Sequence, residues 1–278
     1  MHQNKTLRFI TLLFFGMAVS ACSQNESEDT AVKAEVDSAL PTAIEAEPTI
    51  SVYAAALASP TRPDADRVRD EARKPAQVLE FIGIAPGMTT LDMFSGGGWY
   101  AEIIAHIVGE NGKLFAHTNQ AYRNFVGEAL ADRFAGDRLP QVEIMNAENN
   151  QLSLAENSLD AVTLIQSFHD IYHIDPDNKW DEIDAPAFLA ELKKGLKPGG
   201  IVGIVDHAAA AGAPPETGES LHRIDPELVM TLMEEAGFIF ESSSDLLRNP
   251  DDDRSQSVFA EGIRGNTDRF VLRFRNPG

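Results

Sequence analysis

Histidine and aspartate residues gather at two places in the sequence, each directly after an apolar run. Residues 166–173 (QSFHDIYH) follow one such run, and Asp206-His207 follows a later one. Imidazole has an ordinary pKa of about 6.5, so a histidine can accept or donate a proton at neutral pH, and a nearby carboxylate can orient it. These residue types predict a site that positions a reactant and moves a proton. Its candidate catalytic residues are His169, Asp170, Tyr172 and His207.

A glycine-rich turn lies upstream of both clusters. Residues 91–100 (LDMFSGGGWY) pass from an apolar run through three consecutive glycines into a helix-forming segment. Glycine adopts positive φ and lets a ligand approach the backbone closely, so the turn is a candidate ligand cradle. Dinucleotide sites also use such turns, so the turn alone does not identify the ligand. The alternative is that Asp92 only caps a helix and that the glycines only form a tight turn.

Short apolar runs alternate with longer amphipathic segments, and this alternation predicts the architecture. Strands are expected at residues 89–94, 113–118, 141–147, 159–168, 201–206, 238–247 and 268–274. Helices are expected at residues 64–73, 75–84, 96–108, 122–134, 185–196 and 225–237. The pattern predicts an α/β fold with a doubly wound, mainly parallel seven-stranded sheet, helices on both faces and an N-terminal helical extension. Such sheets bind ligands beyond the carboxyl ends of their strands, where the glycine turn and both clusters would meet.

In order and spacing, these segments resemble those of class I S-adenosylmethionine-dependent methyltransferases. The resemblance spans roughly residues 75–245 and rests on residues 91–100, 142–154, 157–160 and 192–206. The whole chain is similar, more closely, to a family of exported (lipoprotein-type) predicted methyltransferases. That second likeness rests on ARKPAQVLEF, GGGWYAEI, VDHAAAAG, LHRIDP, LLRNPDDDR and GNTDRFVLRF. Together they imply a Rossmann-like methyltransferase fold, S-adenosylmethionine as cofactor, and methyl transfer to a small-molecule acceptor.

The resemblance implies a cofactor site that starts in the glycine turn. Asp92 opens the acidic-x-Gly-x-Gly-x-Gly motif, and Gly96 and Gly98 match its last two glycines. Phe94 stands at the position of the first glycine, which is a departure from the family pattern. We expect a phenylalanine to be tolerated there with a negative φ, and to narrow the floor of the pocket.

The next strand ends depart from the family pattern at two more points. Asn119 stands near the place where the family pairs an acid with both ribose hydroxyls, and an amide can bond one of them. Asn146-Ala147 stands where many members have Asp-Ala, and its amide oxygen can accept a bond from the adenine amino group. The implied cofactor-binding residues are Asp92, Phe94, Ser95, Gly96, Gly98, Asn119, Asn146, Ala147 and Gln166.

By the same resemblance, residues 166–173 face the transferable methyl group. His169 would accept a proton from the acceptor, Asp170 would orient His169, and Tyr172 would contact the cationic sulfonium through its ring. His207 and His222-Arg223 would meet an anionic acceptor. The loop between them is rich in Ala, Gly and Pro, and a loop of that length is often a lid.

Other interpretations of these residues stay open. His169 can be a structural histidine, and His173 can belong to a solvated loop. Histidine and carboxylate suit zinc or iron, but His169, His173, Asp206 and His207 lack a tight ligand spacing, so no metal is expected. A basic and acidic segment upstream of the first strand either covers the cofactor pocket or forms a solvated helix face. Its members are Arg69, Asp70, Arg73 and Lys74.

The first residues have the layout of an export signal. Lys5 and Arg8 precede the apolar run FITLLFFGMAV, which is too short to span a membrane as a helix. Val19-Ser20-Ala21-Cys22 resembles the lipobox of bacterial lipoproteins, which implies acylation of Cys22, the only cysteine. We therefore expect a signal peptide (1–21), a disordered acidic tether (22–50) and a methyltransferase-like domain (51–278). The expected location is the periplasmic side of a bacterial cell envelope, at the outer membrane, with the lipid as the only membrane contact.

Charge narrows the partners further. The chain has 43 acidic against 23 basic residues and a formal net charge of -20, which argues against a nucleic-acid partner. The export signal conflicts with a methyl donor that is made in the cytoplasm. The alternative function is therefore a non-catalytic binding protein on a methyltransferase scaffold. The sequence leaves the acceptor and the oligomeric state open.

Overall fold

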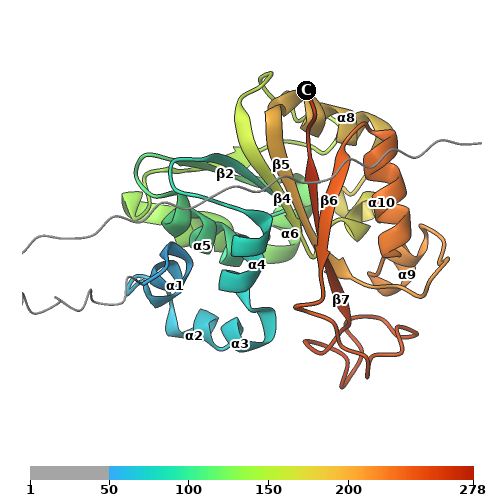
Figure 1. Cartoon of the computed structure of the whole chain (residues 1–278). Coiled ribbons are helices and arrows are strands. Elements are labelled where there is room, and N and C mark those ends of the chain that lie inside the picture. The colour runs from blue at the N-terminus through green and yellow to red at the C-terminus, as the bar shows by residue number, and fades with distance from the viewer. Residues whose placement is uncertain (1–49) are drawn as a thin grey trace, which may run out of the picture. The chain divides into compact units, whose positions relative to one another are not determined.

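A parallel sheet forms the centre of the domain, as Figure 1 shows in a computed structural model that describes residues 50–278. The strands are β1 (Thr89–Met93), β2 (Lys113–Thr118), β3 (Val142–Asn146), β4 (Leu159–Ile165), β5 (Leu196–His207), β6 (Ile239–Ser244) and β7 (Arg269–Arg275). Their order in the sheet is β3-β2-β1-β4-β5-β7-β6, and β7 runs antiparallel to both of its neighbours. The predicted seven-stranded, mainly parallel, doubly wound sheet is confirmed.

Helices cover both faces of this sheet. The longer ones are α4 (Pro75–Ile82), α5 (Trp99–Val108), α8 (Ala185–Gly195) and α10 (Pro226–Glu235). The shorter ones are α1 (Val52–Ala58), α2 (Asp64–Arg67), α3 (Asp70–Arg73), α6 (Gln120–Val126), α7 (Ala129–Phe134) and α9 (Thr217–Leu221). Single-turn 3₁₀ helices lie at Ala135–Asp137, His169–Tyr172 and Pro176–Asn178.

The core consists of two apolar clusters, one on each face of the sheet. Alternate residues of β4 enter opposite clusters: Val162 and Leu164 pack in one, and Ala161 packs in the other. Side chains of a strand alternate between the two faces, so a strand that is apolar throughout must be covered on both sides. This burial explains why β4 is apolar along most of its length.

Two predicted helices are broken in the structure. The expected helix at residues 64–73 divides into α2 and α3, and the expected helix at 122–134 divides at Gly127, which has a φ of +61°. The helix expected to begin at Gly96 begins at Trp99, because Gly98 has a left-handed φ of +78°. The breaks place α2, α3 and α7 around the carboxyl ends of the parallel strands. The connection between β6 and β7 lies at the same end of the sheet (Figure 1).

The predicted signal peptide, Cys22 and almost all of the tether lie outside the described residues. Among residues 50–278, no helix is both long and apolar enough to cross a membrane.

Candidate active site

A cavity of about 950 Å³ opens beyond the carboxyl ends of β4 and β5. This volume is at the upper end of small-molecule sites, which span roughly 300–1,000 Å³. Gln166, His169, Asp170 and His207 reach the cavity from the two strand ends. Other parts of the wall come from α3, α6, the C-terminal end of α9, the connection before β7 and the start of β7, and they include Arg73, Tyr122, His222 and Arg269.

His169 is held between two carboxylates. Its Nδ1 lies 2.8 Å from Asp206 Oδ1, its backbone N–H donates to Asp206 Oδ2 at 2.8 Å, and its Nε2 lies 3.3 Å from Asp170 Oδ1. Burial lowers the pKa of His169, but the negative charges of Asp206 and Asp170 outweigh burial and raise it to about 9. His169 therefore carries a proton at neutral pH, and the expectation that it acts as the proton acceptor is wrong for this geometry.

His207 lies in the opposite electrostatic situation. Burial lowers the pKa of His207 to about 3, and the positive charges of His169, Arg269 and Arg223 act in the same direction against the Asp206 carboxylate. Its Nδ1 lies 2.7 Å from the Thr267 hydroxyl, which fixes the ring. His207 is therefore the neutral imidazole of the pair.

Asp170 joins several groups of the cavity wall. The Tyr122 hydroxyl donates to Asp170 Oδ2 at 2.8 Å, and the Trp180 indole N–H donates to the Asp170 backbone carbonyl at 3.1 Å. His222 Nδ1 lies 4.0 Å from Asp170 Oδ1. Asp170 is thus a shared acceptor for the cavity wall as well as the neighbour of His169.

Tyr172 and Arg223 do not reach the positions predicted for them. Tyr172 packs against the apolar core on the side of α9, and it is not part of the cavity wall. Arg223 is fully buried in a two-pronged ion pair with Asp252, at 2.8 and 3.0 Å, so it is unavailable to an anionic acceptor. Tyr122, which was not among the predicted residues, lines the cavity in place of Tyr172.

The glycine turn lies beside the cavity, packed against the chain itself. A Cβ at Gly98 would lie 2.8 Å from Leu130 and 2.9 Å from Arg133, so no other residue fits at this position without rearrangement. Asp92 is 2% exposed and accepts a hydrogen bond from the Thr163 hydroxyl at 2.7 Å. Burial raises the pKa of Asp92 to about 6. The Ser95 hydroxyl donates to the Asp92 carbonyl at 2.8 Å and closes the turn.

Phe94 adopts a left-handed backbone, so the expected negative φ is wrong. Its φ is +54°, a conformation that is unfavourable for a residue with a large side chain. The ring lies under the site in an aromatic cluster, with centroids 5.7 Å from Tyr122, 5.6 Å from Trp180 and 6.0 Å from Phe188. Phe94 is not part of the cavity wall. Its ring packs against Tyr122 and Trp180, which do line the cavity, and it does not fill the cavity.

The remaining cofactor candidates are distributed around the sheet edge. Asn119 is fully buried; its Oδ1 caps α6 by accepting from the Tyr122 N–H at 2.7 Å, and its Nδ2 donates to Asn149 at 2.8 Å. The predicted bond from Asn119 to a ribose hydroxyl is therefore not available in this conformation. Asn146 and Ala147 line a separate hollow of about 540 Å³ at the end of β3. Of the predicted cofactor residues, only Gln166 reaches the large cavity.

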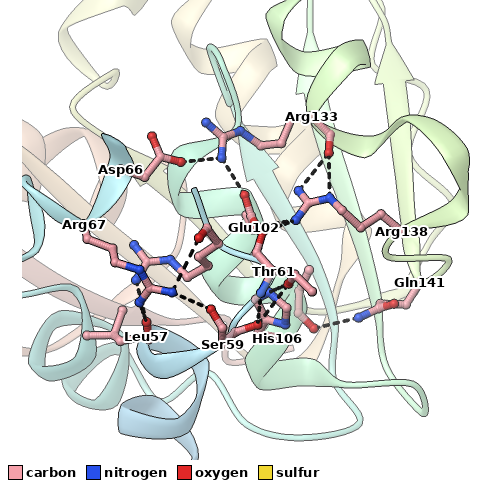
Figure 2. A network of polar contacts seen from close by, with 12 residues as sticks. Leu57, Ser59, Thr61, Asp66, Arg67, Glu102, His106, Arg133, Arg138 and Gln141 are labelled. Carbon is pink, nitrogen blue, oxygen red and sulfur yellow. Dashed lines mark hydrogen bonds and ion pairs between the residues drawn. The ribbon is translucent and has the colours of Figure 1, made fainter. Parts of the chain in front are cut away.

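A network of ion pairs fixes the N-terminal segment beside the glycine turn (Figure 2). Arg133 Nη1 lies 2.6 Å from Asp66 and 2.5 Å from Glu102, and Arg138 lies 2.7 Å from Glu102. Arg133 Nε also donates to the Gly97 carbonyl at 2.5 Å. The network joins α2 and α7 to the turn. It could not be predicted from the sequence, because its members are far apart in the chain.

The N-terminal segment also supplies part of the cavity wall. Arg69 and Arg73 line the cavity, and their guanidinium carbons lie 5.5 and 5.1 Å from the centre of the Trp99 ring. Asp70 pairs with Arg62 at 2.8 Å, and Lys74 donates to the Leu246 carbonyl at 2.9 Å. The two arginines of the predicted cover thus line the cavity, and Asp70 and Lys74 anchor the segment.

Residues 91–204 match the family model of a methyltransferase domain. This segment, 114 of the 278 residues, is similar to methyltransferase domains. No curated protein sequence matches the chain.

Solved structures share the fold of the domain. An S-adenosylmethionine-dependent methyltransferase from Aquifex aeolicus is 22% identical, with a TM-score of 0.53, and the match covers 74% of this chain and 97% of that one. Geranyl diphosphate C-methyltransferase from Streptomyces coelicolor A3(2), bound to Mg²⁺, geranyl diphosphate and S-adenosylhomocysteine, is 15% identical, with a TM-score of 0.53 over 80% of this chain and 89% of that one. The cyclase SpnF is 20% identical, with a TM-score of 0.52 over 74% and 80%. Identities this low show the fold alone.

Some residues around the glycine turn suit an S-adenosyl group, and others do not. The glycine turn has positive φ at Gly96 and Gly98, and the cavity beside it has room for a nucleoside. The departures are the positive φ of Phe94 and the occupied amide of Asn119. The fit is therefore better at the cavity than at the ribose position.

Proposed function

We propose that the methyltransferase domain transfers a methyl group from S-adenosylmethionine to a small molecule bound in the cavity beyond β4 and β5. The observation that carries this proposal is the neutral His207 in the wall of a cavity of about 950 Å³, next to a glycine turn of the methyltransferase type. Gln166 and Tyr122 would contact the methyl donor, because they form the wall nearest the turn and α6. When bound, the donor supplies an electrophilic methyl group.

His207 would receive the proton that the acceptor loses. Thr267 holds the His207 ring in place, so one nitrogen remains for the acceptor. General-base assistance typically contributes about 10²–10⁴-fold to a rate, and positioning of the reactants contributes more.

The acceptor would carry an acidic group. Arg73 and Arg269 both line the cavity, and among residues 50–278 neither forms an ion pair with a carboxylate. Arg269 is 7% exposed; its Nη2 donates to the Ala72 carbonyl at 2.8 Å, and its Nε has no hydrogen-bond partner among the described residues. A buried charge without a counter-charge is costly, so a ligand anion would pair favourably with both guanidinium groups.

Calorimetry with S-adenosylhomocysteine tests the proposed donor site. The full-length protein should bind one molecule per chain, with a dissociation constant below about 100 μM. Incubation of small-molecule extracts with deuterium-methyl-labelled S-adenosylmethionine should then yield a labelled product. No heat and no thermal shift at millimolar S-adenosylhomocysteine would overturn the proposal.

The second candidate function is ligand binding without catalysis. It is favoured by the packing of Gly98 against α7 and by the occupied amide of Asn119. The same fold also occurs in a protein described as a cyclase. Mass spectrometry of ligands retained by the native protein separates the candidates: an adenosyl compound supports the first, and a different retained ligand with no adenosyl compound supports the second.

We propose the cell envelope as the location of the protein, with a lipid on Cys22 as its membrane contact. The support is the lipobox-like sequence before Cys22. Intact-mass measurement of protein from its native membrane should show an acylated N-terminal cysteine, and Cys22→Ser should release the protein from the membrane fraction. A wild-type chain that keeps residues 1–21 and stays unacylated would contradict this.

A further inference from the structure

Three metal-ligating side chains converge in the cavity wall from two separate segments. His169 and Asp170 follow β4, and His222 ends α9, more than fifty residues later in the chain. One nitrogen of each histidine and one carboxylate oxygen all lie within 4.8 Å of one another. The three residues do not form a motif in the sequence, because only folding brings His222 next to His169 and Asp170.

The spacing of these atoms suits a coordination sphere. Bonds of about 2.0–2.2 Å to nitrogen and oxygen place tetrahedral ligand atoms about 3.4 Å apart. His169 Nε2 lies 3.3 Å from Asp170 Oδ1, and His222 Nδ1 lies 4.0 Å from the same oxygen. A shift of well under 1 Å by the partly exposed His222 ring would bring the second distance to the same value.

Both inner ligands already have the supporting contacts that metal sites require. His169 uses its Nδ1 for Asp206, so its Nε2 is the nitrogen directed at Asp170. A metal-binding histidine commonly donates its other ring N–H to a carboxylate, which fixes the ring and the tautomer. Asp170 keeps Oδ1 for the cluster, because its Oδ2 accepts from the Tyr122 hydroxyl at 2.8 Å.

The backbone of His222 supports a functional role for this residue. His222 has a φ of +53° at the C-terminal end of α9. A histidine in the left-handed region is uncommon, and strained residues of this kind concentrate at functional sites. Because all three side chains line the cavity, a bound ion would keep positions open toward it.

We propose that His169, Asp170 and His222 bind a divalent transition-metal ion, with Zn²⁺ as the best match, at the wall of the acceptor cavity. Two imidazoles and one carboxylate favour zinc and its neighbours over Mg²⁺ and Ca²⁺, which prefer all-oxygen sites. Binding of the ion would release the Nε2 proton of His169, and the charge of the ion would replace the charge of that proton beside Asp170 and Asp206. The proposal does not depend on methyl transfer, because it rests only on these side chains.

Metal titration of the untagged full-length protein, stripped with a chelator, tests this site. Zn²⁺ in competition with a chelating dye should bind at one ion per chain, with a dissociation constant below about 1 μM, and Co²⁺ should give visible absorption bands typical of nitrogen and oxygen ligands. His222→Ala and Asp170→Asn should each weaken binding by at least about 100-fold. Asp206→Asn should weaken it by about 10–100-fold, as expected for a residue that positions a ligand.

His173→Gln is the matched control. His173 lies in the same wall, 5.5 Å from His222 between ring centroids, but its Nδ1 faces Glu219. We expect its zinc affinity to stay within about threefold of the wild type, and thermal unfolding should show that every variant is folded. Absence of saturable binding at about 100 μM zinc, or unchanged affinity in folded His222→Ala, would overturn the proposal. Binding of S-adenosylhomocysteine, measured separately, distinguishes this failure from failure of the proposed methyl transfer.

Discussion

At the scale of single residues, burial gives the same side-chain type opposite protonation states. His169 and His207 lie 6.0 Å apart between ring centroids. Two carboxylates raise the pKa of His169 to about 9, whereas burial beside cationic groups lowers the pKa of His207 to about 3. Proton transfer at neutral pH therefore depends on which histidine faces the carboxylates, and the sequence does not contain that information.

His207→Gln should lower methyl transfer by about 10²–10⁴-fold, because the variant loses the neutral imidazole that accepts the proton. The affinity for S-adenosylhomocysteine should stay within about twofold, since His207 is assigned to the acceptor. Single-turnover kinetics with labelled donor measure the first effect, and calorimetry measures the second. Equal losses of rate and donor affinity would show that His207 belongs to the donor site.

Asp92→Asn should stabilise the protein at neutral pH. The folded-state pKa of Asp92 is raised to about 6, above its ordinary value near 3.8, so the native state binds the proton more tightly than the unfolded state. The stability of the wild type should therefore fall as pH rises from about 4 to 6. Asparagine can still accept the Thr163 bond, and the gain at pH 7 should be on the order of 2–3 kcal/mol.

Urea unfolding of both proteins between pH 4 and pH 7.5 checks this. The difference in unfolding free energy should shrink toward zero at the acid end. A difference that is independent of pH would show that the ionised Asp92 carboxylate is not the source.

At the scale of elements, the site depends on short helices that pack on the glycine turn. Arg133 of α7 contacts Asp66 of α2 and Glu102 of α5 (Figure 2), and it also donates to the Gly97 carbonyl. Such buried pairs contribute little net stability, but they fix the geometry of the parts that they join. This contact is possible because Gly127 breaks the predicted helix and lets α7 turn back.

Gly98→Ala should destabilise the protein far more than Gly136→Ala. Both glycines have a left-handed backbone, with φ and ψ of +78° and +20° at Gly98 and of +71° and +30° at Gly136, which costs alanine about 1–2 kcal/mol. A Cβ at Gly98 would also collide with Leu130 and Arg133, adding about 1–3 kcal/mol, whereas a Cβ at Gly136 meets nothing within 4 Å. Urea unfolding of the two variants should show this gap. Equal losses would mean that α7 does not pack on the turn in solution.

At the scale of the whole molecule, charge is distributed unevenly. The chain carries a formal net charge of -20, yet Arg69, Arg73 and Arg269 line one cavity. An acidic surface repels anions in general. An arginine-lined cavity within it therefore favours those anions whose shape fits the cavity. The proposed acidic acceptor follows from this contrast.

Arg269→Gln tests the contrast with inorganic phosphate as a simple anion. Millimolar phosphate should raise the thermal midpoint of the wild type, and the shift should fall by at least half in the variant. Arg269 is the most buried of the four arginines that line the cavity, which are Arg69, Arg73, Arg264 and Arg269. The control is Arg275→Gln, on the same strand but paired with Glu241 outside the cavity. Equal phosphate shifts in both variants would contradict the assignment.

The seven-stranded sheet and the side chains at its strand ends could be predicted from the sequence. Alternating apolar runs and helix signals are local, and a strand covered on both faces must be apolar, so the seven strands could be located. His169, Asp170 and His207 were identified by their place directly after apolar runs, and Gln166 by the resemblance; all four line the cavity.

Tertiary packing sets the arrangement of the side chains at the strand ends. It placed Tyr122 and His222 beside Asp170 and directed Tyr172 into the core. The physical reason is that pKa values, cavity walls and coordination distances depend on groups that are distant in sequence and brought together by packing. A linear pattern records which groups are present, whereas folding sets the distances between them.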